Sequence, residues 1–238
     1  MDLATGRMVG AEALLRWQHP QLGLLSPAAF IDIAEETDLI VPIGEWVLDT
    51  ALEELARWHH ATPHTRLTMS VNISTRQIAS STLLGLTADL LAKHAVDPAM
   101  LCLEITESTL LWDVDAAIAA LSALRGLGVE LAIDDFGTGY SSLGYLKHLP
   151  VDYLKIDRTF VRDMLTDPDD AVIVKAVIDL GSALGLALVA EGVETLEQAE
   201  GLTALGCHLG QGYLWSEPCE PWRALALADV ANHDAPGT

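Results

Sequence analysis

Polar residues recur along the sequence at the ends of segments that otherwise resemble apolar strands. The set comprises Glu12, Asn72, Glu104, Asp134, Asp135, Lys155, Glu191 and Gln211. Carboxylate and amide oxygens make a hard ligand field that suits Mg²⁺ or Mn²⁺, and the set contains no thiolate or His. These residue types predict a divalent-cation site if the fold brings them together. Taken singly, each is equally consistent with a solvated strand end or a helix N-cap.

The adjacent aspartates Asp134 and Asp135 are the most informative pair. Neighbouring strand residues point to opposite faces unless the chain turns, and Gly137 and Gly139 are placed to supply a turn. One aspartate could then bridge two cations about 4 Å apart, a spacing that stabilises the attacking and leaving oxygens in phosphoester hydrolysis. Without such ions the converging carboxylates would repel one another, and one or more would hold a proton.

Lys155 interrupts the otherwise apolar segment 153–157. A lone lysine in a strand often lies at a sheet edge. Inside a barrel two functional interpretations compete: a Schiff-base lysine of the aldolase type, and a cation that orients water and offsets phosphate charge. The surrounding carboxylates favour the second. The aldolase belongs to another enzyme class, and borohydride trapping with a carbonyl substrate would distinguish it.

The elements that must position these residues alternate between strand and helix, which is the pattern of a parallel sheet covered by helices. The expected strands are residues 8–15, 67–72, 101–106, 129–134, 153–157, 187–191 and 207–211. The expected helices begin near residue 28 and at Pro42, and cover 82–95, 113–126, 167–184, 196–205 and 221–232. This order predicts an α/β protein with a modified TIM-type (β/α)8 barrel, whose polar residues meet at the carboxyl ends of the strands.

One strand is missing from that barrel, and it is expected upstream of residue 1. Because no segment is rich enough in Ser and Gly to serve as a linker, a single domain is expected over residues 1–233, followed by a frayed tail at 234–238.

The balance of charges excludes several functions. The chain has 238 residues, and 13 Lys and Arg against 34 Asp and Glu give a net charge of −21. Long DNA or RNA is excluded as a ligand because binding to its backbone requires clustered basic residues. A small dianionic ligand could still bind through bound cations.

Cys102, Cys207 and Cys219 lack CxxC spacing and are expected to be reduced thiols. No apolar run is long enough for a membrane span, so a cytoplasmic protein is expected.

Several motifs, taken in order, resemble a known family. They are Glu-Ala-Leu at 12–14, Asp-Asp-Phe-Gly-Thr-Gly-Tyr-Ser-Ser-Leu at 134–143, Leu-Lys-Ile-Asp at 154–157, residues 190–195, and Gly-Gln-Gly-Tyr at 210–213. Over residues 5–218 the chain resembles the EAL domain, the cyclic di-GMP phosphodiesterase of bacteria. The resemblance implies a modified barrel that uses two divalent cations, Mg²⁺ or Mn²⁺, to hydrolyse cyclic di-GMP to linear pGpG in bacterial signalling.

The resemblance also implies a role for each matching position. One metal would be held by Glu12, Asn72, Glu104 and Asp134, and the second by Asp134, Asp135 and Glu191. The expected catalytic residues are Lys155, which would hold the catalytic water, Glu191 and Glu12; the expected substrate-binding residues are Arg16, Gln211 and Asp135. Glu107 matches a glutamate that anchors the loop 135–143, which the family uses for metal binding and dimerisation, so a homodimer is expected.

The departure from the family pattern lies at the start. Family members normally carry a helix and a strand with a Gln-Pro-Ile-like segment before the point where this sequence begins. The longer protein is expected to include an upstream sensory or GGDEF domain.

The alternative function is a catalytically silent receptor for cyclic di-GMP. Loss of a metal ligand or of the run at 134–143 would have indicated the receptor, and neither is lost.

Overall fold

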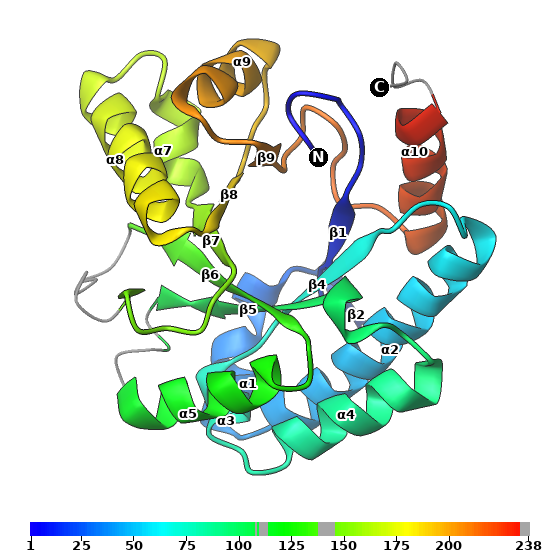
Figure 1. Ribbon diagram of the computed structural model, residues 1–238. Helices are drawn as coiled ribbons and strands as arrows, with labels where there is room; N and C mark the ends of the chain where they lie inside the picture. Colours follow the sequence, from blue (N-terminus) through cyan, green and yellow to red (C-terminus); the bar gives the residue numbers. More distant parts are fainter. Residues whose placement is uncertain (108, 110–113, 138–145, 234–238) are drawn as a thin grey trace.

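A curved sheet of parallel strands forms the centre of the molecule, with helices along its outer side (Figure 1). The computed structural model describes residues 1–107, 109, 114–137 and 146–233. The seven strands lie in the order β1 (Gly10–Ala13), β4 (Thr68–Asn72), β5 (Leu101–Thr106), β6 (Glu130–Phe136), β7 (Tyr153–Ile156), β8 (Ala187–Ala190) and β9 (Leu209–Gly210). Each expected strand segment contains or overlaps one of them, so the predicted α/β class and parallel sheet are confirmed.

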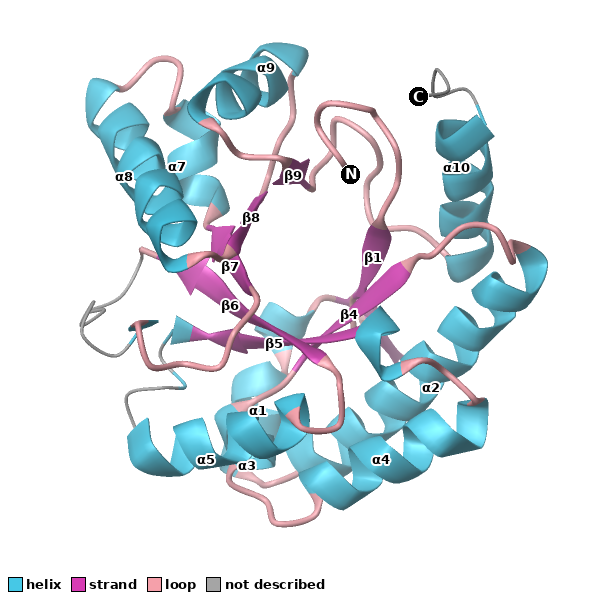
Figure 2. Cartoon of the chain, viewed as in Figure 1, coloured by secondary structure: helices cyan, strands magenta, loops and turns pink. Residues whose placement is uncertain are grey.

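The sheet curls in the manner of a barrel without closing (Figure 2). Within the described part of the chain, β1 pairs only with β4, and β9 pairs in parallel only with β8. The first residues of the chain lie beside β9, where Asp2 forms an isolated antiparallel bridge with Leu209. The architecture is therefore the predicted barrel with one strand missing.

Helices cover the outer side of the sheet. They are α1 (Ile31–Glu36), α2 (Ile40–Ala61), α3 (Thr75–Ile78), α4 (Leu83–His94), α5 (Val114–Arg125), α7 (Arg158–Asp163), α8 (Pro168–Leu184), α9 (Leu196–Leu205) and α10 (Pro221–His233), with 3-10 turns at Pro27–Ala29 and Pro98–Met100. Local sequence sets their ends. The Asp167 carboxylate caps α8 by accepting from the amide of Asp169, and Gly185 ends the same helix in the left-handed conformation.

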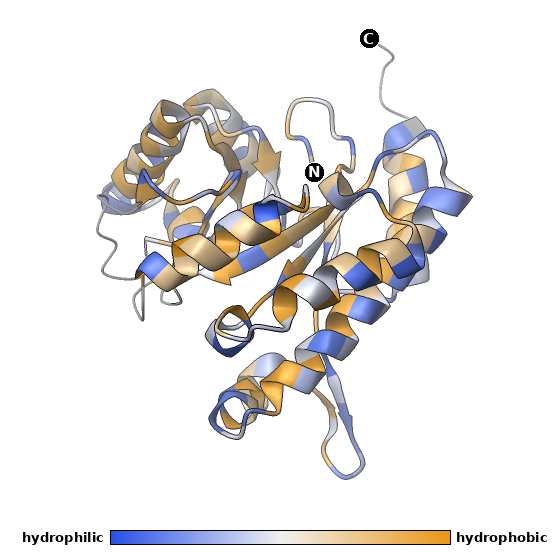
Figure 3. Ribbon diagram, turned by 60° about the horizontal axis from the view of Figure 1, so that its bottom comes forward, coloured by the Kyte–Doolittle hydropathy of each residue, from blue (hydrophilic) through white to orange (hydrophobic). Residues whose placement is uncertain are grey.

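Side chains alternate along each strand between the hydrophobic core under the helices and the inside of the curved sheet. In β5, Leu101, Leu103 and Ile105 are at most 1% exposed and belong to the hydrophobic core under the helices. The residues between them, Cys102 and Glu104, point to the inside of the curved sheet. Figure 3 shows apolar residues concentrated on the strands, and helices along which apolar and hydrophilic residues alternate. The inner face is therefore free to carry polar chemistry.

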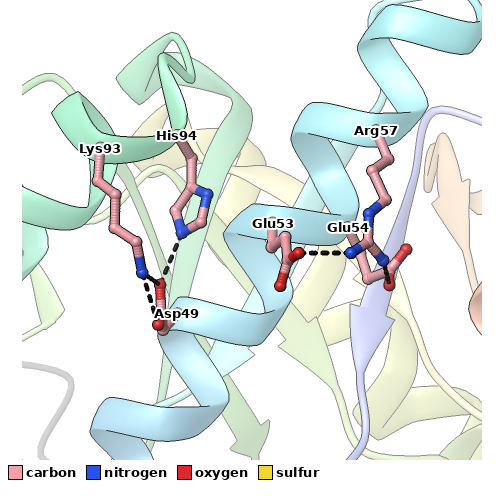
Figure 4. Close-up of polar contacts among 6 residues, drawn as sticks. All are labelled: Asp49, Glu53, Glu54, Arg57, Lys93 and His94. Atoms are coloured by element: carbon pink, nitrogen blue, oxygen red, sulfur yellow. Dashed lines mark hydrogen bonds and ion pairs between the residues drawn. The ribbon is translucent and has the colours of Figure 1, made fainter.

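Ion pairs on the outer surface lie between and along helices and contribute little to the stability of the fold. Asp49 of α2 accepts hydrogen bonds from Lys93 Nζ at 2.7 and 2.8 Å and contacts His94 Nε2 at 2.6 Å, both on α4 (Figure 4). Arg57 pairs with Glu53 and Glu54 along α2 itself. Exposed pairs of this kind contribute about 0–1 kcal/mol each, so the apolar core remains the main source of stability.

Some elements differ from the sequence-based expectation. The helix expected near residue 28 begins as the 3-10 turn Pro27–Ala29. The long helix begins at Ile40, two residues before Pro42, because proline is tolerated within a first helical turn. The hairpin of β2 (Trp17–His19) and β3 (Gly23–Leu25) and the short helices α3 and α7 were not expected. Asp113 and the tail at 234–238 lie outside the described residues.

A close backbone contact that positions the last strand gives a stability test. A Cβ on Gly212 would lie 2.2 Å from the carbonyl oxygen of Val193, and neither main chain can move without disturbing the other. We expect Gly212→Ala to lower the free energy of unfolding by about 1–3 kcal/mol. The control is Gly85→Ala, inside α4, where a Cβ meets nothing within 4 Å and a gain of up to about 1 kcal/mol is expected. Urea unfolding of both variants measures the difference, and equal stabilities would contradict it.

Candidate functional site

Polar side chains from successive strands meet inside the curved sheet, at the carboxyl ends of the strands. The strands are parallel and in register, with Glu12 opposite Ser70 on β4 and Asn72 opposite Glu104 on β5. Side chains two residues apart on one strand share a face. The side chains that point inward at the carboxyl ends of the strands are therefore the polar residues selected from the sequence. The site residues on or directly after these strands are Glu12, Asn72, Glu104, Asp134, Asp135, Lys155, Glu191 and Gln211.

Lys155 lies at the centre of this group and is only 2% exposed. Its Nζ contacts Glu104 Oε2 at 2.5 Å, Glu191 Oε1 at 2.7 Å and Asp134 Oδ1 at 3.2 Å. Glu12 Oε2 lies 3.7 Å away. Burial alone would lower the pKa of the ammonium, but the carboxylates, Glu104 first among them, hold it well above its usual value. The lysine therefore stays charged and serves as the internal counter-ion of the cluster.

Two amides extend the network on the side of Glu12. Asn72 Nδ2 donates to Glu12 Oε1 at 2.6 Å, which leaves the Asn72 carbonyl oxygen as the part of the amide that can bind a cation. Gln211 Nε2 donates to Glu12 Oε2 at 2.9 Å and to Glu191 Oε1 at 2.8 Å. Gln211 thus links the first and last parts of the site.

The chain turns within β6 so that both aspartates reach the site. Between Ile133 and Phe136 the pairing of β6 with β7 shifts by one residue, as in a β-bulge. Asp135 has a φ of 54°, which is uncommon for a residue other than glycine. The chain therefore turns at Asp135 itself and also at the expected Gly137, whose φ is 102°. Gly139 lies outside the described residues. One oxygen each from Asp134, Asp135 and Glu191 lie within 4.8 Å of one another, a spacing that a metal ion could bridge.

The electrostatics of the group match a cation site. Burial raises the pKa of Glu104 to about 7 and that of Glu191 to about 8, and nearby carboxylates add to both rises although Lys155 opposes them. Burial and the adjacent Asp134 raise the pKa of Asp135 to about 6. One ammonium therefore does not compensate all the carboxylates. Because the donors are hard oxygens, the residues present fit a divalent metal such as Mg²⁺ or Mn²⁺.

Asp157 joins the site although sequence reasoning did not select it. It is 7% exposed, and its carboxylate accepts a hydrogen bond from the Asp135 carboxyl group in that group's protonated form. Burial alone would raise the pKa of Asp157, but the hydroxyl and amide of Thr159 hold it below its usual value. Its position two residues after Lys155 was the available signal, because alternate residues of a strand share a face.

Two of the expected residues lie at the margin of the cluster. Arg16 lines the same cavity as Glu12 and Lys155, and its Nη1 donates to its own neighbour Leu15 at 2.8 Å. Glu107 is buried, and its Oε2 accepts a hydrogen bond from the amide of Gly137 at 3.2 Å. Most of the loop that Glu107 is expected to anchor, residues 138–143, lies outside the described residues.

Comparison with known proteins identifies the family. The EAL domain family model matches residues 1–218. The chain belongs to the EAL domain family. The bifunctional diguanylate cyclase/cyclic di-GMP phosphodiesterase MucR of Pseudomonas aeruginosa is 49% identical over 221 residues, covering 93% of this chain. The cyclic di-GMP phosphodiesterase PA2567 of the same organism is 44% identical over 221 residues, again covering 93% of this chain.

Solved structures share the fold of this EAL domain. The PaMucR phosphodiesterase in complex with c-di-GMP has a TM-score of 0.88 and 48% identity, covering 92% of this chain and 89% of that one. The EAL domain of Mycobacterium smegmatis DcpA has a TM-score of 0.80 and 37% identity, covering 97% of this chain and 93% of that one. The chain spans only 32% of MucR and 37% of PA2567, about a third of each. None of the described helices has the length and hydropathy needed to cross a membrane.

The central lysine gives a test of the site's electrostatics. We expect Lys155→Met to lower the free energy of unfolding of metal-free protein by about 3–5 kcal/mol, because it leaves buried carboxylates without their counter-ion. Added Mg²⁺ or Mn²⁺ should then raise the melting temperature of the variant more than that of the wild type.

The matched control is Lys175→Met, which removes an exposed i,i+4 pair with Asp179. We expect a change of at most about 1 kcal/mol there. Thermal and urea unfolding with EDTA and with each metal give both quantities, and equal effects of the two substitutions would refute the buried counter-ion role.

Proposed function

We propose that this EAL domain hydrolyses cyclic di-GMP to linear pGpG with the help of two divalent cations, Mg²⁺ or Mn²⁺. The observation that carries the proposal is the convergence of Lys155 with the carboxylates of Glu12, Glu104, Asp134 and Glu191 at the strand ends. The names of two relatives that are 49% and 44% identical to this chain over 221 aligned residues point to the same reaction. We assign the activity to a single domain spanning residues 1–233.

The proposed ligand sets follow the positions in the fold. Glu12, Asn72, Glu104 and Asp134 would hold one cation, and Asp134, Asp135 and Glu191 the other, with Asp134 shared. When bound, the two cations would supply a water of lowered pKa and neutralise charge that develops on the phosphate oxygens. Asp157, next to Asp135, would add negative charge beside the second set.

The chain's own residues would position water and substrate. Lys155 would donate a hydrogen bond to the attacking water and stabilise negative charge on its oxygen. Glu191, 2.7 Å from Lys155 Nζ, would accept the proton of that water. Attack on phosphorus in line with the ribose 3′ oxygen breaks that P–O bond. The product keeps a 5′ phosphate and gains a 3′ hydroxyl, whose proton comes from solvent.

Two residues would orient the reactants. Gln211 would hold Glu12 and Glu191 in place through the two hydrogen bonds that it donates to them. Arg16, on the wall of the same cavity, would contact a substrate phosphate, where a guanidinium offers paired donors.

A silent receptor for cyclic di-GMP is the alternative, and it predicts binding without turnover. The full set of polar residues favours the enzyme, since a receptor has no need of a buried lysine among carboxylates. We further propose that the domain acts as a homodimer in the cytoplasm, within a longer signalling protein that carries a sensory or GGDEF domain.

Incubation of the purified domain with cyclic di-GMP tests the proposal. With Mg²⁺ we expect linear pGpG, and with EDTA none. Glu12→Ala should abolish turnover even at saturating Mg²⁺, because it removes a ligand and the partner of Asn72 and Gln211. Glu53→Ala, on the exposed side of α2 beside Arg57, is the control and should retain full activity. Near-normal turnover by Glu12→Ala would sink the assignment, and binding without pGpG would favour the receptor.

The identity of the cation gives an independent prediction. We expect Ca²⁺ to inhibit the Mg²⁺-supported reaction, because its longer and more flexible coordination would misplace the attacking water relative to Lys155. Turnover measured at fixed Mg²⁺ with increasing Ca²⁺ should fall, and excess Mg²⁺ should restore it. Stimulation by Ca²⁺ alone would count against the mechanism.

A further inference from the structure

Most basic side chains of this acidic protein are paired with carboxylates. The chain contains 13 Lys and Arg and has a net charge of −21, and most of these cations form ion pairs with Asp or Glu. In the part of the chain that the structure describes, those without an ion pair are Arg7, Arg16, Lys147, Arg158 and Arg223. Arg16, Arg158 and Arg223 line the cavity that also contains Lys155. Cations that lack a carboxylate partner are therefore concentrated where an anionic ligand would bind.

Arg158 is an exposed residue of the cavity wall. It is the first residue of α7 and follows Asp157, whose carboxylate caps that helix by accepting a hydrogen bond from the Thr159 amide at 2.8 Å. Gly192, which follows Glu191, has a φ of 65°, and a Cβ on it would lie 2.5 Å from the Cβ of Arg158. The stem of Arg158 is therefore held between Asp157 and the main chain after β8, beside the second proposed cation set.

The charge of the proposed substrate requires a cation at such a place. Cyclic di-GMP carries two phosphodiesters in one ring, and hydrolysis of one bond involves only one of them. The two divalent cations would neutralise the phosphate that is cleaved. The other phosphate would lie in a cavity whose walls include further carboxylates, Glu194 among them, and like charges repel strongly where little water separates them. A guanidinium without a carboxylate partner would remove this repulsion.

We propose that Arg158 binds the phosphodiester of cyclic di-GMP that is not cleaved. Arg16 follows β1, whereas Arg158 follows β7, on the opposite side of the curved sheet (Figure 2). With Arg16 on the cleaved phosphate, the two arginines would hold the ring from both sides. A guanidinium suits this contact because its planar donors match two phosphate oxygens. The inference rests on the proposed binding of cyclic di-GMP and not on its hydrolysis.

The experiment compares Arg158→Met with the wild type in calorimetric titrations with cyclic di-GMP, in Ca²⁺ to prevent turnover. We expect the Kd to rise about ten-fold, because a charge-assisted contact is lost. Arg158→Lys should recover part of the affinity, since it keeps the charge without the paired donors. In Mg²⁺ the KM should rise by a similar factor while kcat stays near that of the wild type, because the contact is far from the bond that breaks.

A second ligand identifies the group that Arg158 contacts. In this analogue of cyclic di-GMP, one phosphodiester is replaced by an uncharged methylphosphonate and both guanines are kept. The charged phosphate should bind the cations, which leaves the neutral group for Arg158. Arg158→Met should then bind the analogue as tightly as the wild type does. An equal loss of affinity for both ligands would indicate a contact with guanine or a general distortion, and would overturn the proposal.

Arg162→Met is the matched control. Arg162 lies one turn further along α7, pairs with Asp163 at 2.6 Å and is not among the described residues that line the cavity. Its Kd and KM should equal those of the wild type, and because both arginines are exposed, melting temperatures should be unchanged in both variants. An unchanged Kd in Arg158→Met, or an equal rise in Arg162→Met, would refute the contact. A wild type that binds without forming pGpG would refute the hydrolysis alone, whereas one that does not bind would refute both.

Discussion

The structure depends on burying several carboxylates around one ammonium inside a curved sheet. Placing unpaired carboxylates at such depth would be very unfavourable, and Lys155 makes it tolerable by contacting Glu104, Glu191 and Asp134 within 3.2 Å. The arrangement requires strands whose other face is wholly apolar, because the same strands must also anchor the helices. β5 meets both demands, with Leu103 in the outer core and Glu104 on the inside.

Backbone geometry at the carboxyl ends of the strands converts this cluster into a site. A regular strand would present either Asp134 or Asp135 to the interior, and the shift in pairing between β6 and β7 presents both. At the far side, Gly212 allows the chain after β9 to approach Val193 so closely that Gln211 reaches Glu12 and Glu191. Both features lie in short stretches of backbone, yet they decide whether carboxylates from distant parts of the chain face one another.

Most of the site residues could be predicted from the sequence, because a polar residue interrupts an otherwise apolar strand. Glu104 and Lys155 stand out inside apolar strands, and only an inward direction accommodates them. Asp157 was not selected although it lies two residues after Lys155 and so on the same side of the strand, and its contact with Asp135 could not be foreseen without the positive φ of Asp135. The β2–β3 hairpin was missed for a different reason: strands of three residues are too short for an alternating pattern, and a histidine side chain shapes the turn.

The choice of lysine at the centre also bears on how cations could enter. Three of the carboxylates proposed as metal ligands, those of Glu104, Glu191 and Asp134, contact Nζ, so a bound cation would share these groups with the ammonium. An arginine would hold its carboxylates in a fixed, planar fork, whereas a lysine is a compact charge on a flexible stem that can shift by rotation. A lysine can therefore give up some carboxylate contacts and keep others without leaving the site. The same group can then stabilise the metal-free fold and still donate to a water molecule once the carboxylates are shared.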